Sequence, residues 1–121
     1  MECIFCQIIE GKIPSNKVHE NDKFFAFHDI HPKAPVHILV IPKEHHETLQ
    51  DTPSSIMCEM TDFVKETATL LGLDKNGYRF IINNGSDGGQ EVYHLHIHLL
   101  GGTKLKWIDL SEDMDEARKS L

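Results

Sequence analysis

The sequence has few of the features that would place a protein in a membrane, outside the cell or on nucleic acid. No apolar run approaches the roughly 18 residues that a membrane-spanning helix needs. The start, Met1-Glu2-Cys3, has no basic segment of the kind found in signal peptides. Three cysteines are an odd and low number for a disulfide framework. The 12 basic residues are outnumbered by 19 acidic ones, which argues against a nucleic-acid backbone as main partner. We therefore expect a cytoplasmic protein with no membrane and no nucleic-acid partner.

Histidine stands out against this background, with nine copies in 121 residues. A chain of this length can bury one apolar core but not two. Because no repeat, low-complexity tract or long linker interrupts it, we expect residues 1–121 to form a single domain. A small anionic ligand remains compatible with the net charge of −7, since backbone dipoles can bind anions locally.

The spacing of apolar residues predicts an α+β domain. A helical pattern followed by Gly11 predicts a short helix over residues 4–10. A longer helical pattern begins at Thr52 and Pro53, expected as N-cap and first helical residue, and stops at Gly72. Runs rich in β-branched and aromatic residues predict strands at 24–27, 36–41, 78–83 and 94–100. Two strands, a long helix and a closing hairpin are typical of an antiparallel sheet.

The last predicted strand contains three alternating histidines, in the sequence HLHIHLLGG at residues 94–102. Successive strand residues point to opposite faces, so His94, His96 and His98 are expected on one face and the intervening apolar residues in the core. At ~3.3 Å per residue, His94 and His98 lie ~13 Å apart, too far for one zinc to bind all three. The three imidazoles are therefore expected to have different roles.

A possible metal site begins with Cys3 and Cys6. Two thiolates three positions apart can bind one tetrahedral zinc, which then needs two more ligands. His45 or His46, together with His94, are the best candidates. A redox role would need a strand before the pair, and too few residues precede it. The alternative is that no metal binds and the cysteines are small apolar residues.

Three further features bear on the chemistry. His37, inside the predicted strand 36–41, is either a hydrogen-bonded core residue or a support for a neighbouring imidazole. Cys58, on the long helix, is expected in the core. The Gly-rich turn at 83–90 offers backbone N–H groups that favour phosphate, although it is not a P-loop. An imidazole nucleophile, an imidazole donor and an anion-binding turn together predict phosphoryl or nucleotidyl transfer.

The residues now carry a resemblance to a known family. The segment His94–Leu100 resembles the His-φ-His-φ-His-φ-φ signature (φ apolar) of the histidine triad (HIT) superfamily. The chain is similar to its nucleotide-binding branch over most of its length, through Ile4-Phe5 and residues 27–30, 34–37, 41–43 and 88–93. The resemblance implies a five-stranded antiparallel sheet with one short and one long helix. It also implies a homodimer in which two copies form a ten-stranded sheet.

The resemblance implies a reaction as well. His96 corresponds to the nucleophile that attacks the α-phosphorus of a purine nucleoside 5′-phosphoramidate, forming a nucleotidyl-histidine that water hydrolyses. His98 and Asn83 correspond to phosphate-binding positions and His37 to a supporting histidine. In some relatives a structural zinc is held at the positions of Cys3, Cys6, His45 and His94, and catalysis needs no cofactor.

A nucleotide pocket follows from the same resemblance. Asp29 would bind the ribose hydroxyls, and an apolar slot would receive the purine of a nucleoside monophosphate or phosphoramidate. The other positions that match the pocket are Ile4, Phe5, Ile8, Phe27, His28, Ile30 and Leu39. Many relatives carry serine where this chain has Glu91, and an ionised Glu cannot donate a hydrogen bond. Phosphate contacts would then come from the backbone N–H groups of Gly89 and Glu91 and from Gln90.

The segment 103–121 is individual to this chain, so it is expected to be variable. Trp107 matches a tryptophan that reaches the partner's active site in relatives, and the acidic stretch 109–116 is expected to be a solvated helix or tail. Three functions remain open at this point. They are a phosphoramidase, which could also clear aminoacyl-adenylates; a dinucleoside polyphosphate hydrolase; and a non-catalytic nucleotide sensor or scaffold.

Overall fold

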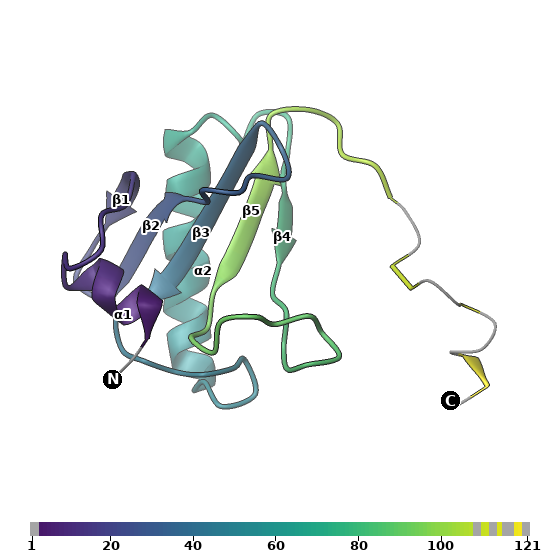
Figure 1. Ribbon diagram of the computed structural model, residues 1–121. Helices are drawn as coiled ribbons and strands as arrows, with labels where there is room; N and C mark the ends of the chain where they lie inside the picture. Colours follow the sequence, from purple (N-terminus) through teal and green to yellow (C-terminus); the bar gives the residue numbers. More distant parts are fainter. Residues whose placement is uncertain (1–2, 108–109, 112–113, 115–117, 120–121) are drawn as a thin grey trace.

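The predicted α+β fold is confirmed. The computed structural model describes residues 3–107, 110–111, 114 and 118–119. Five antiparallel strands form one sheet in the order β1-β2-β3-β5-β4 (Figure 1). The elements are α1 (Ile4–Ile9), β1 (Lys17–Glu20), β2 (Phe24–His28), β3 (Val36–Pro42), α2 (Ser54–Leu70), β4 (Arg79–Ile81) and β5 (Ile97–Gly101).

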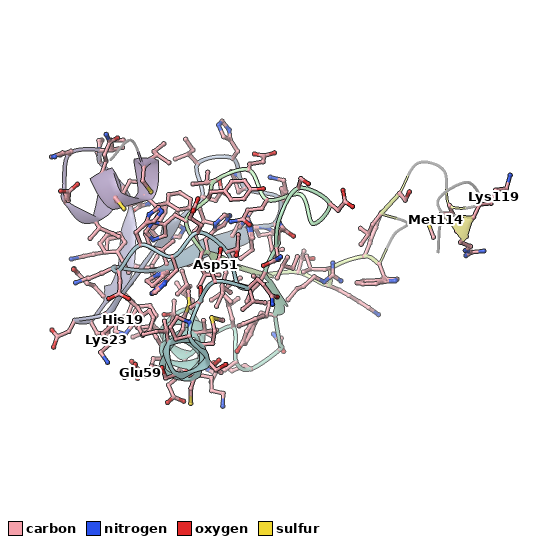
Figure 2. All side chains as sticks on the ribbon, turned by 90° about the horizontal axis from the view of Figure 1, so that it is seen from below. His19, Lys23, Asp51, Glu59, Met114 and Lys119 are labelled. Atoms are coloured by element: carbon pink, nitrogen blue, oxygen red, sulfur yellow. The ribbon has the colours of Figure 1, made fainter. Side chains whose placement is uncertain are left out.

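The two helices lie on opposite faces of the sheet (Figures 1 and 2). Strand β3 shows why, because its residues are apolar on both sides. Ile38 and Val40 pack in the apolar cluster that includes residues of α2, whereas Leu39 and Ile41 pack in a second cluster that includes residues of α1. The expectation of a single core was therefore wrong, because the sheet is covered on both faces. The alternation of a strand thus supplies two apolar layers from one continuous run.

The helix ends follow local sequence signals. Each helix is stopped by a predicted glycine with positive φ two residues after its last residue, Gly11 at 79° after α1 and Gly72 at 72° after α2, and α1 ends one residue before the predicted residue 10. At the start of α1, the Sγ of Cys3 accepts a hydrogen bond from the backbone N–H of Cys6. For α2 the prediction was wrong by one residue, since Pro53 is the N-cap and no side chain caps the helix.

The strand bounds differ from the prediction by more than one residue at three places. Strand β1 was not expected from the residues themselves, because KVHE is a short, partly exposed edge segment without an apolar run. Strand β4 is shorter than the predicted 78–83. Strand β5 begins at Ile97 instead of residue 94, because Pro42 ends the neighbouring β3 and has no N–H to continue the ladder.

The expectation that Cys58 lies in the core was wrong. Cys58 is exposed, since the buried face of the helix is formed by other residues, among them Met60 and Phe63. Figure 2 shows Lys23 and Glu59 beside each other, and Nζ of Lys23 lies 2.8 Å from Oε1 of Glu59. Among the described residues, no helix is both long and apolar enough to cross a bilayer.

The chain leaves the sheet after Gly102 (Figure 1). Trp107 is 81% exposed, and the guanidinium carbon of Arg79 lies 5.5 Å from the centre of its ring. Figure 2 shows Met114 and Lys119 away from the body of the domain. The predicted acidic stretch 109–116 lies partly outside the described residues, so its expected helix or tail stays a prediction.

Candidate active site and metal centre

Residues 94–96 lie just before the first sheet pair of β5, which joins Val40 to Ile97. The backbone here is held by a hydrogen bond from the N–H of Leu95 to the carbonyl of His46, at 2.7 Å. The expected alternation continues through this segment, because Leu95 and Ile97 are in the core with α2 while the histidines lie on the α1 side of the sheet.

The hydrogen bond of His96 fixes the position of its proton. Its Nδ1 lies 2.8 Å from the carbonyl oxygen of His94, which can only accept, so Nδ1 carries the proton. Burial lowers the pKa of His96, and the imidazole is neutral at pH 7. The rings of Phe5 and His96 pack in a T-shaped arrangement with their centroids 5.1 Å apart. Because the proton of His96 is on Nδ1, its free lone pair is on Nε2, as a nucleophile requires.

His98 receives the opposite tautomer through a relay. The backbone N–H of Lys33 donates to Nδ1 of His37 at 3.1 Å, so the proton of neutral His37 is on Nε2. That Nε2–H donates to Nδ1 of His98 at 2.9 Å. Burial lowers the pKa of His37 and brings the pKa of His98 to about 4. Neutral His98 therefore keeps its proton on Nε2, where it can donate to an anion.

Asp29 supports this relay from the end of β2. One carboxylate oxygen, Oδ2, lies 3.4 Å from Nε2 of His37, and the other accepts the backbone N–H of His31 at 2.8 Å. Asp29, His37 and His98 are close enough together to suggest a metal site. The relay argues against one, because Nδ1 of His37 is an acceptor and its Nε2 is then protonated, with no lone pair for a metal.

These histidines line a cleft of about 500 Å³ on the α1 side of the sheet. The cleft brings together most of the residues expected to bind a nucleotide. The lining residues that were expected are Ile4, Phe5, Ile8, Phe27, His28, Asp29, Ile30, His37, Leu39, Asn83, Gly89, Glu91, His96 and His98. Those that the sequence did not indicate are Ile13, Pro14, Ser15, His31, Lys33, Ile81, Val92 and Leu100. Val92 and Leu100 belong to segments that carry the family resemblance, and the others are only near expected residues in the sequence.

Gln90 is the exception among the expected pocket residues, because it does not line the cleft. Its buried amide donates to the carbonyls of Glu47 and Val92 at 2.7 and 3.0 Å, and its Oε1 accepts the N–H of Gly85. The side chain of Gln90 therefore holds the loop together from outside the cleft. The backbone N–H of Gly89, expected on phosphate, donates to Ser86 within the same loop.

The loop also needs a glycine at Gly88. A Cβ at this position would lie 2.5 Å from the carbonyl oxygen of Asn84, which is closer than real Cβ contacts allow. The side chain of Asn84 accepts the N–H of Gln50, so the loop is tied to the segment before α2. A compact loop of this kind holds Asn83 and Glu91 at the cleft.

A second cluster of possible metal ligands lies next to Phe5, whose ring contacts His94 as well as His96. The ligand atoms of Cys3, Cys6, His45 and His94 are all within 4.8 Å of one another. Nδ1 of His94 is 3.3 Å from Sγ of Cys3 and 3.1 Å from Nδ1 of His45, and Sγ of Cys6 is 3.4 Å from Nδ1 of His45. Tetrahedral zinc with this donor set has ligand–ligand edges of about 3.3–3.8 Å. The residues present therefore fit a metal ion.

The protonation of His94 suits a metal ligand. Its Nε2–H donates to the carbonyl of Pro42 at 2.8 Å, which leaves the lone pair of Nδ1 facing the cysteines. Burial brings the pKa of His94 to about 4 and raises the pKa of the metal-free Cys6 thiol to about 11. Of the two histidines left open by the sequence, His45 enters the cluster, whereas Nε2 of His46 lies 2.8 Å from Oε1 of Glu44.

Comparison with known proteins identifies the class to which this fold and site belong. The HIT domain family profile matches residues 10–105. An uncharacterized HIT-like protein of Helicobacter pylori is 45% identical over 101 residues, which cover 84% of this chain and 97% of the relative. The chain therefore belongs to the HIT domain family.

Solved structures agree with this assignment. A histidine triad protein from Clostridium difficile is 48% identical with a TM-score of 0.85, covering 90% of this chain and 97% of that one. A HIT family hydrolase from Legionella pneumophila is 44% identical with a TM-score of 0.83, covering 88% and 97%. A histidine triad nucleotide-binding protein from Candida albicans is 37% identical with a TM-score of 0.78, covering 98% and 92%.

Proposed function

We propose that this protein is a hydrolase of purine nucleoside 5′-phosphoramidates, in the nucleotide-binding branch of the HIT family. The observation that carries the proposal is the pair of opposite tautomers on His96 and His98 in one cleft. One imidazole has a lone pair available for attack and the other has a proton available for an anion. Two of the solved relatives are described as HIT family hydrolases, which supports the same class of activity.

The proposed reaction has two displacements at phosphorus. Nε2 of His96 attacks the α-phosphorus, the P–N bond breaks, and the amine leaves with a proton taken from solvent. The resulting nucleotidyl-histidine is then attacked by water, which breaks the P–N bond to His96. The products are a nucleoside monophosphate and the regenerated imidazole. His98 donates Nε2–H to the phosphoryl oxygens in both steps, which stabilises the developing charge.

The cleft also suits the remainder of the substrate. Apolar side chains of α1, β2 and β3 form a wall for the flat purine, and Asp29 is available to the ribose hydroxyls. Asn83 and His98 lie at the phosphate end in this proposal. Aminoacyl-adenylates share the nucleoside monophosphate part and are a second substrate class for the same cleft.

Zinc is the metal that we propose for the cluster of Cys3, Cys6, His45 and His94. When bound, it would crosslink α1 to the segments around His45 and His94, and the proposed chemistry takes no step through it. We further propose a cytoplasmic homodimer with a ten-stranded sheet, supported by the exposed Phe80 on the edge strand β4.

The test is turnover of adenosine 5′-phosphoramidate by the wild type, with mass spectrometry of His98→Ala to detect a nucleotidyl adduct. Hydrolysis together with an adduct on His96 is the expected result. Tight binding of adenosine monophosphate without any hydrolysis would overturn it in favour of a nucleotide sensor or scaffold. Faster cleavage of diadenosine polyphosphates than of the phosphoramidate would favour the dinucleoside polyphosphate hydrolase.

A further inference from the structure

The proposed nucleophile is not held by the sheet. Strand β5 first pairs with β3 at Ile97, one residue after His96, and Pro42 cannot donate to extend the ladder. An imidazole that must attack phosphorus needs its position fixed within a fraction of an ångström. Its placement therefore depends on contacts outside the regular strand pairing.

Two contacts of His96 lead directly to the cysteine and histidine cluster. The first is the hydrogen bond from Nδ1–H to the carbonyl of His94, whose own Nδ1 faces Sγ of Cys3 at 3.3 Å. The second is the ring of Phe5, whose centroid is 5.1 Å from that of His96 and 5.8 Å from that of His94. Phe5 lies on α1 between Cys3 and Cys6, so the cluster flanks it in sequence and in space.

Helix α1 depends on its surroundings for its place. It has only six residues, and a helix of that length is not stable by itself in water. It nevertheless supplies Ile4, Phe5 and Ile8 to the cleft. Both cysteines of the cluster are at its start, where Cys3 also caps it, so the cluster ties this wall of the cleft to the segment that carries His96.

We propose that Cys3 and Cys6, through the metal that their cluster binds, are positioning residues for His96 and for the α1 wall of the cleft. The cluster thus sets catalytic geometry in addition to supporting the fold. The kinetic part of this inference rests on the proposed function, whereas nucleotide binding and the state of His96 can be measured without turnover.

The experiment compares the full-length protein loaded with Zn²⁺, stripped by a chelator, and reloaded. The readouts are zinc content, kcat and KM for adenosine 5′-phosphoramidate, Kd for adenosine monophosphate, and the ¹⁵N signals of His96. Cys58→Ser is the matched thiol control, because Cys58 is exposed on α2. Val64→Ala is the stability control, since Val64 is buried in the core that includes α2 and does not line the cleft.

We expect one zinc per chain. Stripping should lower kcat about tenfold and raise the Kd for the nucleotide, with reloading restoring both. The His96 signals should change from one defined tautomer to an average of two. Cys58→Ser should match the wild type, and Val64→Ala should lower the melting temperature without these changes.

Two results would overturn the inference. One is a protein that binds no zinc. The other is a stripped, folded protein with unaltered nucleotide Kd and unaltered His96 signals. Should the stripped protein unfold, His45→Gln removes one ligand outside α1 and gives the same comparison. A loaded protein without turnover would refute the proposed function, and the Kd and His96 signals would still decide the positioning role.

Discussion

The histidines of the cluster and of the cleft have the same side chain, but the proton and the lone pair of each imidazole face different partners. In the cluster, Nε2–H of His94 is bound to a carbonyl and the lone pair of Nδ1 faces two sulfurs. In the cleft, His96 has its proton on Nδ1 and His98 has its proton on Nε2. The difference lies in the hydrogen-bond partner of the second ring nitrogen. That partner determines whether an imidazole is a ligand, a nucleophile or a donor.

The largest loss of activity is expected when the proposed nucleophile is removed. In the proposed function, His96→Ala should lower kcat by about 10⁴-fold or more, because the covalent step has no substitute. The Kd for adenosine monophosphate should stay close to that of the wild type, since the apolar wall is retained. His19→Ala is the control, because His19 packs on Phe63 and is not in the cleft. Substantial turnover by His96→Ala would refute the role of this residue.

Removing the cluster should affect stability most. We expect Cys3→Ser with Cys6→Ser to lower the free energy of unfolding by about 3 kcal/mol, or roughly 10 °C in Tm. Thermal unfolding followed by circular dichroism, with metal analysis of the same samples, measures this. Cys58→Ser should leave Tm within about 1 °C of the wild type, as is usual for a surface substitution. Equal melting temperatures for all three proteins would contradict a structural metal.

The hydrogen-bond relay to His98 can be tested by substitution of His37. His37→Phe removes the donor to Nδ1 of His98, so His98 can adopt either tautomer and kcat should fall about tenfold. His37→Gln is the matched variant, since its amide N–H can still donate, and it should keep more activity. The measurement is steady-state kinetics on the phosphoramidate. The same loss of activity in both variants would mean that size, and not the donated proton, is what matters.

The smallest expected effect concerns pH. Burial holds the pKa of His98 at about 4, below the usual value of 6.5, so the unfolded chain binds a proton first as the pH falls. The resulting stability difference is absent above about pH 7 and grows as the pH falls from about 6.5 to about 4. Tm should therefore fall less over this range in His98→Asn than in the wild type. Identical pH dependence in the two proteins would contradict the buried, neutral state of His98.

Much of the fold was predictable because it depends on local pattern. The apolar alternation around Ile38 and Ile97 and the glycines that end both helices are visible in the sequence. Strand β1 was not predictable from its own residues, since an edge strand with polar side chains gains its structure from pairing with β2.

For the candidate site too, some features follow from local sequence and others depend on the fold. The sequence alone predicted which residues would carry the chemistry, because the spacing of two cysteines and three alternating histidines is a local property. Folding was needed to show that Gln90 holds the loop and where each imidazole keeps its proton, and to separate His45 from His46 without the family resemblance. The physical reason is that those outcomes depend on distant backbone groups, such as the carbonyl of Pro42 and the N–H of Lys33, which only folding brings to the rings.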